Sequence, residues 1–179
     1  MDKLPELFFQ QTLRHWHFEA LVQESGLSRE RVHFYLKQLI QKKLIQRIKP
    51  RRKMPYYRSN IENPAFRMEK RLFGLQLLEQ SRLFQSLQSN QAIITAIIFG
   101  SFARGDWSQS SDVDLFIYGD DTYFNQREVE QKLGRSLQVF SFQDPHLITE
   151  ELEPALITNI IKGFNIKGTV EPFEVFIHA

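Results

Sequence analysis

The chain contains no cysteine and no long uninterrupted apolar segment. Without cysteine there is neither a disulfide framework nor a thiolate metal site, so a bound metal must use oxygen or imidazole ligands. No segment approaches the roughly 18 consecutive apolar residues of a membrane span. Residues 1–5 place no basic stretch before an apolar core, so we expect no signal peptide, no membrane association and a cytoplasmic protein.

The overall composition is that of an ordinary globular protein. Of 179 residues, 42% are hydrophobic and 25% are charged. These values exclude disordered, collagenous and fibrous classes. The length allows one large domain or two small ones.

The net charge of +2 hides a strong asymmetry along the chain. Residues 1–59 carry 13 basic and 5 acidic side chains, whereas residues 90–179 carry 6 and 13. Residues 60–89 are nearly balanced, with 4 and 3. The asymmetry predicts two modules with different partners, a polyanion at the basic front and cations at the acidic back.

The basic front shows the pattern of a helix-turn-helix. Residues 5–23 carry apolar side chains at helical spacing and are expected to form two helices that meet near residues 15–17. Gly26 is typical of a helix C-terminus, and Ser28 is typical of an N-cap. In the helix that follows, the expected buried face consists of Val32, Leu36, Leu39 and Ile40.

A basic β-hairpin is expected after these helices. Residues 45–49 alternate between apolar and polar, Tyr56 and Tyr57 fit a return strand, and prolines bracket a basic tip at 51–53. Residues 27–32 and 36–45 in particular resemble the winged-helix DNA-binding domains of bacterial and archaeal transcription regulators. The resemblance covers about residues 5–59 and implies DNA as a partner.

The expected DNA contacts are basic side chains that lie off the buried face of the second helix, together with the hairpin tip. The alternative is a solvated basic face, or a hairpin that docks a protein. The DNA-binding candidates are Arg29, Arg31, His33 and Lys37 with the neighbouring Gln38, and Arg51, Arg52 and Lys53 at the tip.

A long helix over residues 65–88 is expected between the two modules, because apolar residues recur there without an internal proline. It either bridges the modules or pairs with its copy in a homodimer. The predicted organisation is a winged helix over 1–59, a linking helix over 60–89 and a second domain over 90–179.

The acidic back contains the motif that carries chemistry. An apolar run at 92–99 predicts a buried strand, and it leads directly into Gly100 and Ser101. Glycine after a strand lets backbone N–H groups approach a phosphate, and Arg104 can add a fork of donors. Asp112 and Asp114 begin the next strand two residues apart, so both carboxylates share one face and suit a Mg²⁺ ion.

These residues resemble the signature of the nucleotidyltransferase superfamily related to DNA polymerase beta, most of all its minimal bacterial and archaeal members. The segments concerned are residues 100–105 and 111–115. The resemblance implies a small mixed sheet with helices packed on one face. It also implies that Asp112 and Asp114 are catalytic ligands of two Mg²⁺ ions and that the nucleoside triphosphate is bound by Gly100, Ser101, Arg104 and Ser111.

One position departs from the family pattern. The family carries a third carboxylate on a later strand, and the residue that aligns with it here is Gln138. Glutamine binds Mg²⁺ weakly and cannot act as a carboxylate base. Asp144 could replace the missing carboxylate from another place, although Asp144-Pro145 is more typical of a helix start.

The sequence therefore predicts an α+β protein: a mostly helical winged helix, a linking helix and a mixed-sheet nucleotidyltransferase fold. Two functions stay open. One is a Mg²⁺-dependent transfer of NMP from NTP to an acceptor hydroxyl, with a toxin-like partner protein as one acceptor. The other is a transcription regulator whose degenerate nucleotidyltransferase domain binds only a nucleotide or a partner.

Overall fold

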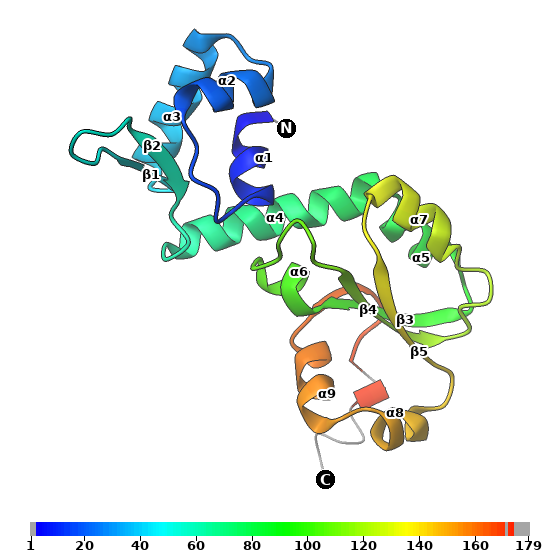
Figure 1. Ribbon diagram of the computed structural model, residues 1–179. Helices are drawn as coiled ribbons and strands as arrows, with labels where there is room; N and C mark the ends of the chain where they lie inside the picture. Colours follow the sequence, from blue (N-terminus) through cyan, green and yellow to red (C-terminus); the bar gives the residue numbers. More distant parts are fainter. Residues whose placement is uncertain (1–2, 171, 174–179) are drawn as a thin grey trace. The chain divides into compact units, whose positions relative to one another are not determined.

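The computed structural model describes residues 3–170 and 172–173 (Figure 1). The chain divides into two compact units, Met1–Phe73 and Gly74–Ala179, and the division falls within helix α4 (Pro64–Gln80). Among the described residues, no helix combines the length and the apolar character that crossing a membrane requires.

From residue 3 to the start of α4, the first unit contains three helices followed by a β-hairpin, in the order that the sequence predicts. The two hairpin strands pair antiparallel, Ile45 opposite Ser59, and Trp16 forms an isolated bridge with Tyr57. The elements are α1 (Lys3–Gln10), α2 (Phe18–Ser25), α3 (Arg29–Gln41), β1 (Ile45–Ile48) and β2 (Tyr56–Ser59).

Both predicted helix ends in this unit are confirmed. Gly26 ends α2 with φ 65°, and its N–H donates to the carbonyl of Val22. This left-handed conformation favours glycine because it has no Cβ. Ser28 caps α3, and its side chain accepts from the N–H of Arg31. Together the two caps define the turn between α2 and α3.

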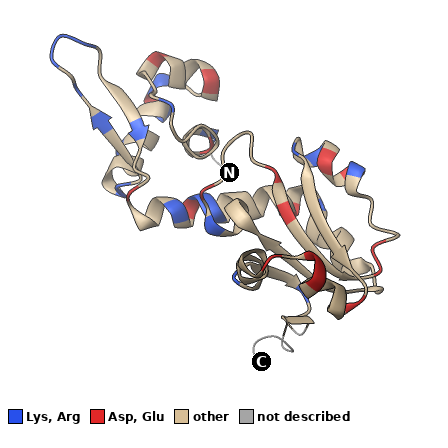
Figure 2. Cartoon of the chain, turned by 60° about the horizontal axis from the view of Figure 1, so that its bottom comes forward, with Lys and Arg blue, Asp and Glu red and all other residues tan. Residues whose placement is uncertain are grey.

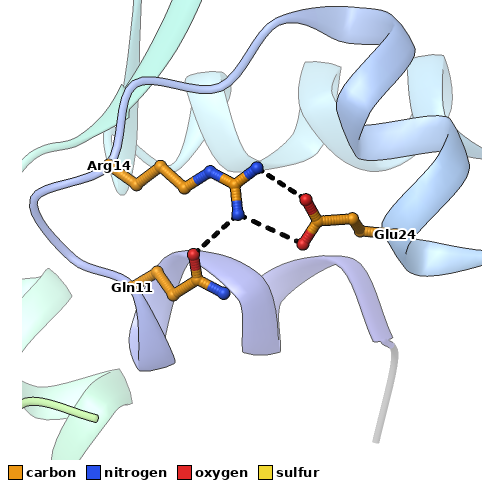
Figure 3. A network of polar contacts seen from close by, with 3 residues as sticks. All are labelled: Gln11, Arg14 and Glu24. Atoms are coloured by element: carbon orange, nitrogen blue, oxygen red, sulfur yellow. Dashed lines mark hydrogen bonds and ion pairs between the residues drawn. The ribbon is translucent and has the colours of Figure 1, made fainter. Parts of the chain in front are cut away.

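Arg14, in the segment between α1 and α2, contacts α2 and the residue that directly follows α1 (Figure 3). Its guanidinium donates to both carboxylate oxygens of Glu24, at 2.6 and 3.2 Å, and to Gln11 Oε1 at 2.8 Å. The guanidinium carbon also lies 3.8 Å from the ring centroid of the buried Trp16. This two-pronged geometry is the arrangement in which an arginine–carboxylate pair is strongest.

One of the four residues predicted to form the buried face of α3 is not buried. Val32, Leu36 and Leu39 are buried, but Ile40 is 38% exposed. The four apolar residues form a stripe along α3 that is wider than the surface covered by α1, α2 and the hairpin. The residue at the edge of this stripe therefore stays in contact with solvent. Ile40 lines a groove of about 720 Å³ whose other lining residues include Phe34, Lys37, Arg47 and Tyr57.

The predicted single helix over 65–88 is also wrong, since the segment forms α4 and a separate helix, α5 (Leu83–Ser89). The break lies at Arg82, which has φ 65°, a left-handed conformation that a helix interior does not contain. The turn lets Ser81, Leu83 and Leu87 all be buried. The hydrophobic pattern is the same on both sides of the break, which is why the sequence suggests one helix.

Within the described residues, the second unit is built on a four-stranded mixed sheet with the strand order β5-β4-β3-β6 (Figure 1). The central strands β3 and β4 pair antiparallel, and β4 pairs parallel with β5. The elements are β3 (Ile93–Phe99), α6 (Gly100–Arg104), β4 (Val113–Gly119), α7 (Gln126–Leu133), β5 (Leu137–Phe142), α8 (Pro145–Glu151), α9 (Pro154–Ile161) and β6 (Phe164–Lys167).

Both faces of this sheet are covered, which corrects the expectation of helices on one face. Phe99 and Phe116 pack with Ile148 of α8 and Ile160 of α9 in one hydrophobic core. Side chains of opposite orientation on the same strands, such as Ile98 and Leu115, are equally buried. Figure 1 shows α5 and α7 on that other side. The site at the end of β3 is therefore anchored in a sheet that is buried on both sides.

The chain after β5 forms two helices and an edge strand. The apolar spacing over residues 147–161 suggests one helix after Asp144-Pro145, which is wrong, because α8 ends before Pro154 begins α9. The loose alternation of residues 164–178 suggests edge structure or a terminal strand, and β6, which pairs with β3, accounts for its first part. Residues 175–177 lie outside the described residues.

Substitution at Arg82 tests the break between α4 and α5. R82G and R82A remove the same side chain, but only glycine relieves the positive φ. We expect R82G to be more stable than R82A by about 1 kcal/mol in urea unfolding. A continuous helix would reverse the order, since glycine costs a helix interior about 1 kcal/mol relative to alanine.

Candidate functional site

The site begins where β3 ends and its chain turns into α6. Gly100 has φ +65°, and a Cβ built on it would lie 1.9 Å from Asp114 Oδ2. Both observations require glycine at this position. The antiparallel register places Phe99 opposite Asp114, so the end of β3 and the start of β4 meet here. The structure thus brings the predicted glycine turn and the predicted carboxylate together.

The backbone N–H of Ser101 lies close enough to the Asp114 carboxylate to lower its pKa. The sequence predicts Ser101 as a residue that donates hydrogen bonds to phosphate, and here its N–H acts on a carboxylate of the chain. Backbone N–H groups of a short turn are suited to bind oxygen anions. The turn therefore faces the carboxylate at the start of β4.

Burial raises the pKa of the Asp114 carboxyl, and the negative charge of Asp112 raises it further. Arg104 and the Ser101 N–H act in the opposite direction. A carboxylate whose pKa is raised by burial and by a neighbouring negative charge is stabilised in its ionised form by a nearby cation. The electrostatics therefore favour a bound cation at Asp112 and Asp114.

Arg104 lies at the end of α6, within electrostatic reach of Asp114. Its Nε donates to Asp106 Oδ2 at 3.0 Å, and its Nη1 donates to Asn159 Oδ1 at 3.4 Å. The side chain is 53% exposed, so its remaining donors are accessible. An anionic ligand beside Asp114 can compete for this guanidinium.

Ser111 is placed beside Asp112, but its hydroxyl is engaged within its own loop. Its Oγ accepts from the N–H of Ser108 at 2.8 Å, and the hydroxyls of Ser108 and Ser111 are 3.1 Å apart. Ser110 also contacts Ser108, at 3.1 Å between the hydroxyl oxygens. These contacts shape the loop that leads into β4.

Gln138 occupies the position that the sequence predicts for it. In the parallel pairing of β4 with β5, Gln138 is the register partner of Asp114, so both side chains lie on the same face. Asp144 caps α8 through the N–H of His146, as its helix-start pattern indicates. It follows the end of β5 that pairs with Tyr118, away from Asp114.

The residues present fit one divalent cation better than two. Asp112 and Asp114 supply hard oxygen ligands, and the neighbouring Gln138 supplies only an amide. Within residues 3–170, 172 and 173, no group of three or more histidine or acidic side chains is arranged to hold a metal. Bound nucleotide phosphates would have to complete the coordination sphere.

Sequence reasoning missed Arg135, whose guanidinium contacts the loop before Asp112. Its Nη1 donates to the carbonyl oxygens of Ser108, Gln109 and Ser111 at 2.8, 2.7 and 3.0 Å. The only sequence signal is an arginine two residues before a strand. Its meaning depends on the parallel pairing of β4 with β5, which the sequence does not state.

In the first unit, the predicted DNA-binding side chains are all exposed, but two of them also contact other side chains of the chain. Arg31, Lys37 and the hairpin tip at residues 51–53 are exposed, and Figure 2 shows the tip as a basic segment. Arg29 is exposed, donates to Glu19 Oε2 at 2.5 Å and lies over the ring of Phe18. His33 is also exposed and packs edge-on against the ring of Phe18.

Comparison with known proteins identifies part of the chain. Residues 81–167 match the family described as "Polymerase beta, Nucleotidyltransferase". Residues 81–167 are a nucleotidyltransferase domain of the polymerase beta type. This range contains the glycine turn, the aspartate pair and Gln138, so the candidate site belongs to the nucleotidyltransferase domain. No curated protein matches the chain.

Two solved structures are similar to part of the chain. One is a mutant of the toxin-antitoxin MntA-HpeT, with 17% identity, and the other is a toxin-antitoxin with AMP-PNP, with 19% identity. Each similarity covers 55% of this chain and 87% of the other, with a TM-score of 0.38.

Alanine at Gly100 tests the close approach to Asp114. We expect G100A to be less stable than G134A in urea unfolding and to bind Mn²⁺ more weakly than the unmodified chain. Gly134 has φ +68° but no atom within 4 Å of an added Cβ, so G134A carries only the backbone strain of about 1 kcal/mol. Equal effects of the two substitutions would contradict the close approach.

Proposed function

We propose that the nucleotidyltransferase domain binds a nucleoside triphosphate together with one divalent cation and transfers its nucleotidyl group poorly or not at all. The proposal is carried by one observation: Gln138 stands in register beside Asp114, where the family resemblance leads us to expect a carboxylate. Such a domain suits a regulator that senses nucleotide, the second function that the sequence leaves open.

The roles of the binding residues follow from their chemistry. Asp112 and Asp114 would hold Mg²⁺, which neutralises phosphate charge when it is bound. The turn at Gly100 and Ser101 would direct backbone N–H groups to the phosphate oxygens, and Arg104 would add a charged donor. None of these functions requires a third carboxylate.

Transfer makes one further demand. The acceptor hydroxyl oxygen forms a bond to the α-phosphorus, the bond to the bridging oxygen breaks, and pyrophosphate leaves. The hydroxyl proton must pass to a base, and an amide side chain such as Gln138 cannot accept it. The site therefore retains what binding needs and lacks a group that turnover needs.

Active transfer is the second candidate, and the intact glycine turn and aspartate pair favour it. In that case NMP would pass from NTP to a hydroxyl of a protein, nucleic acid or small molecule. A toxin-like partner protein is the acceptor that the family resemblance suggests, with two Mg²⁺ ions at the site.

Restoring the carboxylate distinguishes the two candidates. We expect wild-type protein with labelled ATP, CTP or GTP and Mg²⁺ to release little pyrophosphate, and Q138D to release at least about 100-fold more, the lower end of the usual range for general acid–base catalysis. Q143D adds an acid beyond the other end of β5 and should change nothing. Fast release by wild type that D112A/D114A abolishes would favour the active enzyme and contradict the proposal.

We also propose that the first unit is a winged helix that binds DNA. The order of three helices and a hairpin supports it, as does the exposure of Arg31, Lys37 and the basic tip at residues 51–53. Exposed arginines and lysines bind phosphates without desolvation of a buried charge. Arg29 is a weaker candidate, because a DNA contact would compete with its ion pair to Glu19.

Removal of two tip arginines tests DNA binding. R51A/R52A should weaken binding of duplex DNA and reduce the slope of log affinity against log salt by about 2, close to one per lost phosphate contact. R127A/R82A removes two exposed arginines of the other unit and should leave the slope unchanged. Failure of the wild-type chain to bind duplex DNA at low salt would reject the proposal.

A further inference from the structure

We propose that Arg135 is the positioning residue of the cation site: its guanidinium fixes the loop over residues 107–111 and thereby places the carboxylate of Asp112. This inference rests on the proposed function, in which Asp112 binds a divalent cation. It assigns a role to a side chain outside the glycine turn and the aspartate pair.

The hydrogen bonds of Arg135 converge on a single nitrogen. Nη1 reaches the carbonyl oxygens of Ser108, Gln109 and Ser111, all within 3.0 Å. Three carbonyl dipoles that point at one place repel one another unless a cation lies between them. The guanidinium is that cation, and Ser111 directly precedes Asp112.

Two aromatic rings also contact the guanidinium of Arg135. The rings of Phe102 and Trp107 stack with centroids 5.1 Å apart, and the Arg135 Cζ lies 5.5 and 5.1 Å from them. Burial lowers the pKa of Arg135, but an arginine stays protonated in proteins. The guanidinium therefore keeps its positive charge in a partly desolvated site, where its hydrogen bonds are strong.

Gly74 makes room for this aromatic pair. A Cβ on Gly74 would lie 2.9 Å from Trp107 Nε1 and 3.2 Å from Phe102 Cδ1. The helix therefore approaches the stacked rings more closely than any other residue type would allow. The rings form a fixed platform, so the position of Arg135 is fixed as well.

Asp112 depends on this support because its own side chain has little. Its side chain is exposed to solvent. Its placement is set by the backbone on either side. Arg135 holds the preceding residues, and the N–H of Val113 donates to the carbonyl of Ser136 at 3.0 Å. Both supports come from the same two-residue segment, which follows Gly134.

The first experiment measures Mn²⁺ binding by electron paramagnetic resonance for the full chain and its R135M variant. Methionine keeps an apolar stem on the aromatic platform and removes every donor, so the variant is expected to fold. We expect its Mn²⁺ affinity to fall by about 10- to 100-fold, the usual effect of losing an outer-shell partner of a metal ligand. R127A, an exposed arginine on α7, should bind like wild type.

The second experiment uses chemical rescue, which a merely structural role would not produce. R135A leaves a cavity of about the size of a guanidinium ion, lined by three carbonyl oxygens. Guanidinium chloride at a concentration far below that of unfolding should restore Mn²⁺ affinity to R135A, and the same concentration of NaCl should not. Urea unfolding of each variant verifies that it is folded.

The outcomes separate this inference from the proposed function. A wild-type chain that binds no Mn²⁺ overturns the proposed function and this inference with it. A wild-type chain that binds Mn²⁺, beside a folded R135M that binds it equally well, overturns this inference alone. A weakened, folded R135A that guanidinium does not restore overturns it too. If R135A does not fold, R135M still decides.

Discussion

The close approach of the Gly100 backbone to the Asp114 carboxylate is the constraint on which the site depends. An added Cβ would lie 1.9 Å from the carboxylate, so β3 and β4 can meet in this way only if the turn carries glycine. The N–H of Ser101 and the charge of Asp112 both act on this carboxylate, in opposite directions. Because the sheet is buried on both faces, it holds this arrangement without help from a ligand.

Binding and transfer place different demands on this arrangement. Binding needs oxygen ligands, backbone donors and a guanidinium, and all of these lie around Asp114. Transfer also needs a group that takes a proton, and the parallel register puts the amide of Gln138 beside Asp114. On the proposed function, the domain binds a nucleotide without efficient transfer.

The sequence predicts those parts of the fold that depend on neighbouring residues. The caps at Gly26 and Ser28 and the strand, glycine turn and aspartate pair could all be read directly, because each is a local pattern. The position of Gln138 was predicted from the family resemblance and is confirmed by the register. The break at Arg82, the exposure of Ile40 and the loop contacts of Arg135 could not be predicted. Each depends on what packs against the segment from elsewhere in the chain.

The most direct test of the central claim is the affinity of the full chain for a fluorescent ATP analogue, measured with Mg²⁺ and with EDTA. We expect binding that requires the metal and is lost in D112A/D114A. The double variant should unfold at the same urea concentration as wild type or a higher one, because two repelling carboxylates are removed. Binding that is equally tight in EDTA, or unchanged in the double variant, would contradict the central claim.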